Sequence, residues 1–190
     1  MKLGIEGKTA VITGGDSGIG LATAKVLAAE GANILLSDIK QDNLDKAVEE
    51  LKSHAGNARV IGVVADLSDN NSVLKLAEAA DAEFGGANIL INCAGARGAA
   101  GDFLTLTDND WQQTIDIDLM GAVRVCRAFI PQLQKKGWGR VVLVSSENAF
   151  QPYEEESPYN ACKAGIINLS KCLSRSYSNC LLYTSPSPRD

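Results

Sequence analysis

The sequence has few of the residues that build metal centres, disulfide frameworks or nucleic-acid interfaces. It contains one histidine and five cysteines, with no Cys-x-x-Cys pair, so we expect no metal site and a reduced, cytoplasmic setting. Asp and Glu total 23 against 18 Lys and Arg, a net charge of −5, which argues against nucleic acid as a partner. No apolar run reaches the length of a membrane span, and no apolar leader opens the chain. We expect no membrane partner, and we expect the longest acidic run, Glu154–Glu156, to be solvated.

What the sequence does contain is a regular alternation of short apolar runs and helical patterns. A length of 190 residues fits one domain. The strand-like runs cover residues 8–13, 33–37, 59–64, 88–91 and 140–144. Such alternation predicts an α/β fold in which helices cover both faces of a parallel sheet. One residue at or just after each strand is glycine or polar: Gly14, Asp38, Asp66, Asn92 and Ser146. Ligands in such sheets bind at the carboxyl ends of the strands, so these residues predict the site.

The first strand leads directly into a glycine-rich turn. Residues Thr13–Gly20 read TGGDSGIG, and a helical pattern follows at once until Glu30-Gly31. Glycines allow a tight turn and a close approach to a pyrophosphate, while the helix N-terminus offers free N–H groups. A glycine loop alone is also typical of an ordinary turn, but a preceding strand and a following helix favour nucleotide binding.

Asp38 ends the second strand-like run, 18 residues after Gly20. A dinucleotide site places an acid at about this distance to bind the ribose 2′-hydroxyl. The carboxylate would repel a 2′-phosphate, and neither Ser17 nor Ile39 supplies a cation to receive one. We therefore expect NAD rather than NADP. The alternative is that Asp38 only caps the next helix.

Tyr159 and Lys163 stand four residues apart, after Ser157-Pro158, which is typical of an N-cap followed by the first helical position. Positions i and i+4 share one helix face. A tyrosine with its ordinary pKa of about 10 is a poor base at neutral pH. A neighbouring ammonium favours the phenolate, so the spacing is suited to proton abstraction. Ser146 follows the apolar run 141–144, and we expect its hydroxyl at the mouth of a buried strand.

Taken together and in order, these motifs resemble the short-chain dehydrogenase/reductase family, over about residues 3–175. Thr13–Gly20 is similar to its TGxxxGIG loop, Asp66-Leu67 to the pair beside the adenine, and Asn92–Gly95 to its NAG turn. The resemblance implies a Rossmann-type, doubly wound parallel sheet with strand order 3-2-1-4-5. It implies a cofactor site formed by Gly14, Asp16, Ser17, Gly18, Ile19, Gly20, Asp38, Ile39, Asp66, Leu67, Asn92, Ala94, Gly95, Tyr159 and Lys163.

The resemblance also implies an activity. Ser146, Tyr159 and Lys163 match the family's catalytic set. The expected reaction is NAD-dependent hydride transfer between a small-molecule secondary alcohol and its ketone, in a homodimer or homotetramer. We expect the loop 96–102 and the segment 148–157 to contact the substrate. Two other functions stay open: an NAD-binding module without turnover, and a structural partner that acts through its helix faces.

One position departs from the family pattern. Asp118-Leu119-Met120-Gly121 stands where family members have Asn-x-x-Gly. In the family the asparagine helps to hold a water that links the catalytic lysine to solvent. A carboxylate can also hold a water, and it would raise the pKa of the lysine. Asp118 is therefore included among the catalytic residues.

The pattern changes after residue 175. Residues 176–190 contain two prolines among serines and no helical or strand period, and they resemble a translated sequencing adapter. We expect residues 1–175 to be an incomplete family domain and residues 176–190 to be a non-native or disordered tail. A fragment that lacks later strands would expose an apolar edge at its fifth strand and would turn over weakly or not at all.

Overall fold

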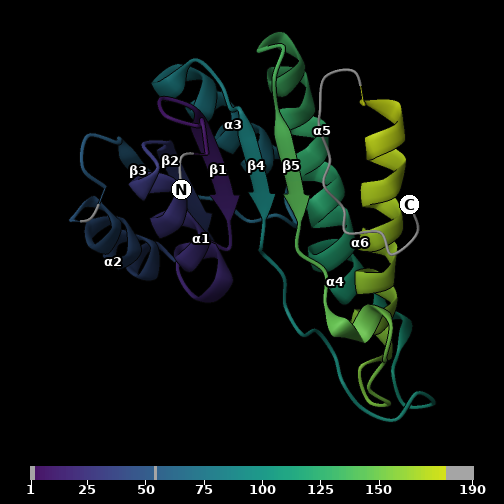
Figure 1. The fold of residues 1–190 in the computed structure, drawn as a ribbon. Coiled ribbons are helices and arrows are strands. Elements are labelled where there is room, and N and C mark those ends of the chain that lie inside the picture. The colour runs from purple at the N-terminus through teal and green to yellow at the C-terminus, as the bar shows by residue number, and fades with distance from the viewer. Residues whose placement is uncertain (1–2, 54, 179–190) are drawn as a thin grey trace.

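Five parallel strands form one sheet in the computed structural model, which describes residues 3–53 and 55–178. The order across the sheet is β3-β2-β1-β4-β5 (Figure 1), as predicted. The strands are β1 (Thr9–Thr13), β2 (Asn33–Asp38), β3 (Val60–Val64), β4 (Ile89–Asn92) and β5 (Arg140–Leu143). The order reverses at β1, which lies between β2 and β4, and this is where doubly wound sheets bind nucleotides.

Within the described residues, six α-helices connect and cover the strands (Figure 1). They are α1 (Gly18–Ala29), α2 (Gln41–Lys52), α3 (Asn70–Phe84), α4 (Asp108–Thr114), α5 (Met120–Lys135) and α6 (Ser157–Ser176). Two separate apolar cores result. One packs α3 and α5 against Val11, Leu35 and Leu90, and the other packs α1 and α2 against Ile12, Ile34 and Leu36. Neighbouring strand residues thus point into opposite cores, which explains why these strands are apolar throughout.

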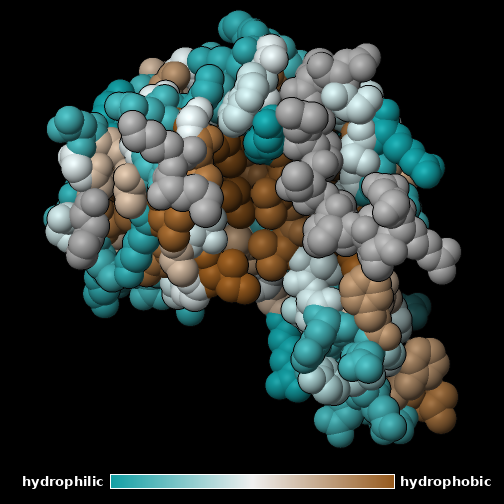
Figure 2. All heavy atoms as spheres, viewed as in Figure 1, coloured by the Kyte–Doolittle hydropathy of each residue, from teal (hydrophilic) through white to brown (hydrophobic). Residues whose placement is uncertain are grey.

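β5 differs from the other strands because it is the outer strand of the described sheet. Val141 is buried, but Val142 is 45% exposed. The run before Ser146, expected as a buried strand, is buried on one face only, and β5 lies at the edge of the described sheet, as was also expected. Figure 2 shows apolar side chains gathered in a hollow on this side of the molecule, over β4 and β5.

The helical region before β5 is not one α-helix. The sequence pattern that Trp111 opens predicts one long helix to about Lys135, with Pro131 near its end, but a π-helical segment, η1 (Ile115–Leu119), separates α4 from α5. α4 begins at Asp108, within the Thr107–Asp110 segment that marks a helix start in the sequence, because Thr107 and Asp110 form a reciprocal capping box. π-Helical turns often occur at functional sites, and this one carries Asp118.

The two ends of α6 also differ slightly from expectation. Ser157 is the first helical residue and makes no capping hydrogen bond, while Glu156 occupies the N-cap position. At the other end the helix continues through Ser176, and Tyr177 packs with Leu173 against the core beneath α5. The last helix of the described residues therefore ends one residue beyond position 175. The rest of the predicted tail, residues 179–190, lies outside the described residues.

Candidate active site

A cavity of about 440 Å³ lies at the carboxyl ends of β1, β2, β3 and β4. The predicted residues that line it are Gly14, Asp16, Ser17, Gly18, Ile19, Gly20, Asp38, Ile39, Asp66, Leu67, Ala94 and Gly95. Thr13, Ser37, Ala65, Cys93, Ala96 and Ile117 complete the lining. Residues from four separate strand ends therefore meet around one space, as parallel topology requires.

The glycine turn leaves no room for side chains. A Cβ on Gly20 would lie 2.0 Å from the carbonyl oxygen of Gly14. A Cβ on Gly14, which has a φ of +62°, would lie 2.7 Å from the backbone nitrogen of Ala94. These contacts bring the β1–α1 turn directly against the turn after β4. The N-terminus of α1 then faces the cavity, where its free N–H groups suit a pyrophosphate.

The carboxylates of Asp16 and Asp38 lie next to each other in the lining of this cavity. Burial raises the pKa of Asp38, and the neighbouring Asp16 raises it further, while the backbone N–H of Ile39 acts in the opposite direction. Asp16 accepts hydrogen bonds from Ser17 Oγ at 2.8 Å and from Asn43 Nδ2 at 3.2 Å. Asp38 does not cap α2, because Lys40 occupies that N-cap position. Its carboxylate is available to a ligand in the cavity.

Asn92 lies behind the cavity rather than in its lining. Its Oδ1 accepts a hydrogen bond from Thr13 Oγ1 at 2.8 Å, and both residues are almost fully buried. This bond links the ends of β1 and β4, where the two residues are paired in register. Its geometry therefore indicates that Asn92 supports the turn that follows it, Cys93–Gly95.

A second cavity, of about 670 Å³, adjoins the first. The two share Ile19, Cys93, Gly95 and Ala96 in their linings. The second is also lined by Arg97, Val144, Ser145, Ser146, Glu147, Asn148, Glu156, Tyr159 and Lys163. A molecule long enough to fill the first cavity would therefore reach Ser146, Tyr159 and Lys163 across the shared turn.

Lys163, on α6, contacts Tyr159 of the same helix and the segment that follows β5. Its Nζ lies 5.3 Å from the centroid of the Tyr159 ring and donates to the carbonyl oxygen of Val144 at 3.4 Å. Ser145 Oγ donates to the backbone carbonyl of Lys163 at 2.7 Å, which fixes the end of β5 against α6. Lys163 is only 5% exposed. The predicted i, i+4 pairing of lysine and tyrosine is thus present, with the ammonium over the ring.

Asp118 completes the surroundings of the lysine from η1. Its Oδ1 lies 3.4 Å from Lys163 Nζ, an ion pair that is long for a hydrogen bond. Its Oδ2 accepts from the backbone nitrogen of Ala96 at 3.3 Å. Burial raises the pKa of Asp118, and the Lys163 charge lowers it in part. A Cβ on Gly95 would lie 2.6 Å from Oδ1, so the shared turn needs glycine above this carboxylate.

Sequence reasoning missed the role of Glu156. The run Glu154–Glu156 was expected to be solvated, and Glu154 and Glu155 are exposed, but Glu156 is only 7% exposed. It is buried because Arg97 pairs with one carboxylate oxygen and Asn148 Nδ2 donates to the other at 2.9 Å. The partners come from loops 59 and 8 residues away, so nothing in the local sequence indicated this network.

Within residues 3–53 and 55–178, no group of three or more His, Cys, Asp or Glu side chains is placed to hold a metal ion. Across those same residues, no helix has both the length and the apolar character needed to pass through a lipid bilayer.

Comparison with known proteins gives consistent relatives. The chain is 36% identical over 171 residues to an uncharacterised oxidoreductase, YvrD, of Bacillus subtilis, covering 90% of this chain and 63% of that protein. It is 36% identical over 169 residues to D-beta-hydroxybutyrate dehydrogenase of Cupriavidus necator, covering 88% and 64%. The structure of L-sorbose reductase from Gluconobacter frateurii, complexed with NADPH and L-sorbose, matches with a TM-score of 0.90 at 37% identity, covering 95% and 68%.

NAD+-bound xylitol dehydrogenase matches with a TM-score of 0.88 at 26% identity, covering 93% of this chain and 68% of that one. The chain spans 63% and 64% of the lengths of the two curated relatives named above. A family profile described as short chain dehydrogenase matches residues 8–180. The chain therefore belongs to the short-chain dehydrogenase family.

Proposed function

We propose that this chain carries the cofactor site and the reacting side chains of an NAD-dependent oxidoreductase that interconverts a secondary alcohol and a ketone. The observation that carries the proposal is the joining of the two cavities. One is a glycine-walled space at the switch of strand order, and the other holds Ser146, Tyr159 and Lys163. A dinucleotide spans two such subsites, with its reactive ring toward the second.

The residues of the first cavity fit a dinucleotide. The Gly14 and Gly20 contacts leave a side-chain-free wall for the pyrophosphate, and the Asp38 carboxylate suits a ribose hydroxyl. Asp16 adds a second negative charge beside Asp38, which disfavours the 2′-phosphate of NADP. Among the structural relatives, xylitol dehydrogenase is described as NAD+-bound and L-sorbose reductase as complexed with NADPH. The acidic pair is the reason for proposing NAD here.

In oxidation, the Tyr159 phenolate takes the proton from the substrate hydroxyl as a general base. The ammonium of Lys163 lies 5.3 Å from the Tyr159 ring centroid, so a positive charge stands beside the reacting side chain. Ser146 Oγ donates a hydrogen bond to the substrate oxygen as negative charge develops there. A bound nicotinamide supplies the hydride acceptor. In reduction, Tyr159 returns the proton to the same oxygen.

Asp118 holds Lys163 in this scheme. Its carboxylate contacts both the lysine ammonium and the turn that walls the nicotinamide end, through Ala96. It takes the place of the family asparagine as a polar group beside the lysine. We include it in the reacting set as a positioning residue. From the family resemblance we propose that the substrate is a small alcohol or ketone and that the assembly is a homodimer or homotetramer. From the odd cysteine count we propose a cytoplasmic location.

The experiment is an NAD-dependent assay of the protein with a panel of secondary alcohols, read by NADH absorbance. Tyr159→Phe should lower kcat by at least about 1000-fold, because the ring stays but the base is lost. Calorimetry should show a Kd for NAD within about twofold of that of the unchanged protein, since the ring and Lys163 remain. Turnover that survives in Tyr159→Phe would remove the tyrosine from the role of base.

One observation favours a second candidate function, a nucleotide-binding module without turnover. Lys163 contacts the Asp118 carboxylate, and this pairing offsets part of the positive charge in the catalytic cavity. Tight NAD binding by calorimetry, without NADH formation from any alcohol in the panel, would support the module over the enzyme.

A further inference from the structure

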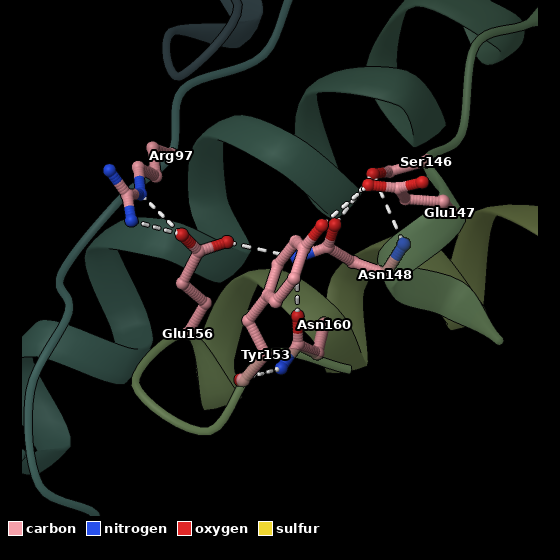
Figure 3. Close-up of polar contacts among 7 residues, drawn as sticks. All are labelled: Arg97, Ser146, Glu147, Asn148, Tyr153, Glu156 and Asn160. Carbon is pink, nitrogen blue, oxygen red and sulfur yellow. Dashed lines mark hydrogen bonds and ion pairs between the residues drawn. The ribbon is translucent and has the colours of Figure 1, made fainter. Parts of the chain in front are cut away.

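A network of polar side chains joins the mouth of the second cavity to Ser146. Figure 3 shows Glu156 between Arg97 on one side and Asn148 on the other, with Asn160 beneath Asn148. Asn148 is 5% exposed, and it belongs to the short 3₁₀ segment η2 (Glu147–Ala149) that follows β5. Its amide reaches both Glu156 and Ser146, so it is the central member of the network.

The donors and acceptors of this network allow only one orientation of the Asn148 amide. Nδ2 donates to Glu156 Oε2 at 2.9 Å and to Asn160 Oδ1 at 2.8 Å. A carboxylate only accepts hydrogen bonds. The Asn160 amide is fixed as well, because its own Nδ2 donates to the carbonyl of Tyr153 at 2.7 Å. Turning the Asn148 amide over would place its oxygen against two other oxygens, so Oδ1 must face Ser146.

Ser146 meets Asn148 twice. Its Oγ donates to Asn148 Oδ1 at 3.1 Å and accepts from the backbone nitrogen of Asn148 at 3.3 Å. The position of Oγ and the direction of its proton are both set by this one residue. A second staggered position of the hydroxyl would break the side-chain contact, so one χ1 rotamer is favoured.

The outer end of the network explains why a carboxylate is stable there. Glu156 is buried, and burying a carboxylate without a partner is costly. Arg97 pairs with it from the loop after β4, with the arginine side chain 71% exposed. The loop after β4 and the segment before α6 are thereby held together over the cavity that contains Ser146, Tyr159 and Lys163.

We propose that Asn148 is a positioning residue for Ser146, held in its one useful orientation by Glu156 and Asn160, with Arg97 neutralising the buried carboxylate. The inference rests on the proposed function for its effect on turnover, and the orientation of Ser146 is a separate property of the fold. A substrate oxygen must then compete with Asn148 Oδ1 for the Ser146 proton, while the Oγ stays in place.

The test combines Asn148→Ala with Ser146→Ala. Asn148→Ala removes the side chain and keeps the backbone N–H that contacts Oγ. We expect kcat to fall by about tenfold with the KM for NAD unchanged, because one orienting hydrogen bond is lost. In the Ser146→Ala background, Asn148→Ala should lower kcat by less than about twofold, because Asn148 acts through the Ser146 hydroxyl. An equal loss of kcat in both backgrounds would overturn the proposal.

A spectroscopic readout is independent of turnover. Three-bond couplings in serine-labelled protein report χ1 of Ser146, and we expect a single rotamer that becomes averaged in Asn148→Ala. Glu156→Gln should partly average the χ1 rotamer of Ser146. Glu155→Gln makes the same charge change at an exposed neighbour and should leave that rotamer unaltered. An unchanged single rotamer in Asn148→Ala would overturn the proposal. If neither the unchanged protein nor any variant oxidised an alcohol of the panel, the proposed function would fail. The couplings would still show whether Asn148 orients Ser146.

Discussion

The two adjoining cavities are built in different ways. The nucleotide cavity is formed by the glycine turn after β1 and by the residues that follow β2, β3 and β4, and core side chains such as Ile12, Leu35 and Leu90 are fully buried behind it. The catalytic cavity is built mainly from side chains of η2, α6 and the loops after β4 and β5, beside the half-exposed strand β5. One site follows from the path of the chain, and the other follows from hydrogen bonds between distant side chains.

This difference separates two kinds of sensitivity. A backbone-built site fails when extra volume enters it, because protein interiors have few voids to absorb an added atom. A site built from side chains responds according to the group that is replaced: a change that keeps shape and contacts costs little, whereas one that removes a reacting group costs most of the rate. The variants below test that contrast in order of decreasing expected effect.

Gly20→Ala should do the most damage to the nucleotide cavity. The added Cβ would lie 2.0 Å from the Gly14 carbonyl oxygen, so the turn must move. Overpacking typically costs about 1–3 kcal/mol, and the Kd for NAD by calorimetry should rise by roughly 100-fold. Gly137→Ala is the control, because no atom lies within 4 Å of its Cβ position; its φ of +64° adds backbone strain that Gly20 lacks, so an effect specific to Gly20→Ala comes from the added volume. NAD affinity unaffected by Gly20→Ala would show that the turn can shift freely.

Asp38→Ala should weaken NAD binding by about tenfold, the order expected for one hydrogen bond to a charged group. It should also narrow the preference for NAD over NADP, because one of two carboxylates that repel a 2′-phosphate is removed. Titration with both cofactors measures this. Asp42→Ala, at an exposed acid in the first turn of α2, serves as the control. An unaltered ratio of the two Kd values would exclude Asp38 from cofactor choice.

Asp118→Asn should have the smallest effect on rate. The amide keeps the shape and can accept from the Ala96 nitrogen, so kcat should stay within about twofold or improve. A fall of more than about tenfold would give the carboxylate a role of its own.

Asp118→Asn should also change how the free energy of unfolding depends on pH. Burial raises the folded-state pKa of Asp118 above its ordinary value of 3.8. The folded protein then binds the proton more tightly than the unfolded chain does. The free energy of unfolding should therefore fall relative to that of Asp118→Asn as pH rises from 3.8 through the raised pKa, and the difference should be constant above it. Urea unfolding across this pH range measures it, and a difference of the opposite slope would contradict the burial argument.

The contrast between the cavities also explains which predictions succeeded. The turn at Thr13–Gly20 could be predicted because the glycines, the strand before them and the helix after them are neighbours in sequence. Strand order and the two-sided core followed the expected pattern as well. The π-helical segment was missed because no local pattern in 111–135 separates a π turn from an α turn, and its place depends on what Asp118 and Arg124 contact.

The sequence by itself determined the alternating α/β fold, the glycine turn and the four-residue spacing of Tyr159 and Lys163, because each depends on residues close together in the chain. Only the tertiary structure decided that Glu156 is buried, that Asn148 directs its oxygen at Ser146, and that the Cys93–Ala96 turn is common to both cavities. Those features depend on contacts between segments far apart in sequence. Burial and hydrogen-bond partners are set by packing, which no local pattern specifies.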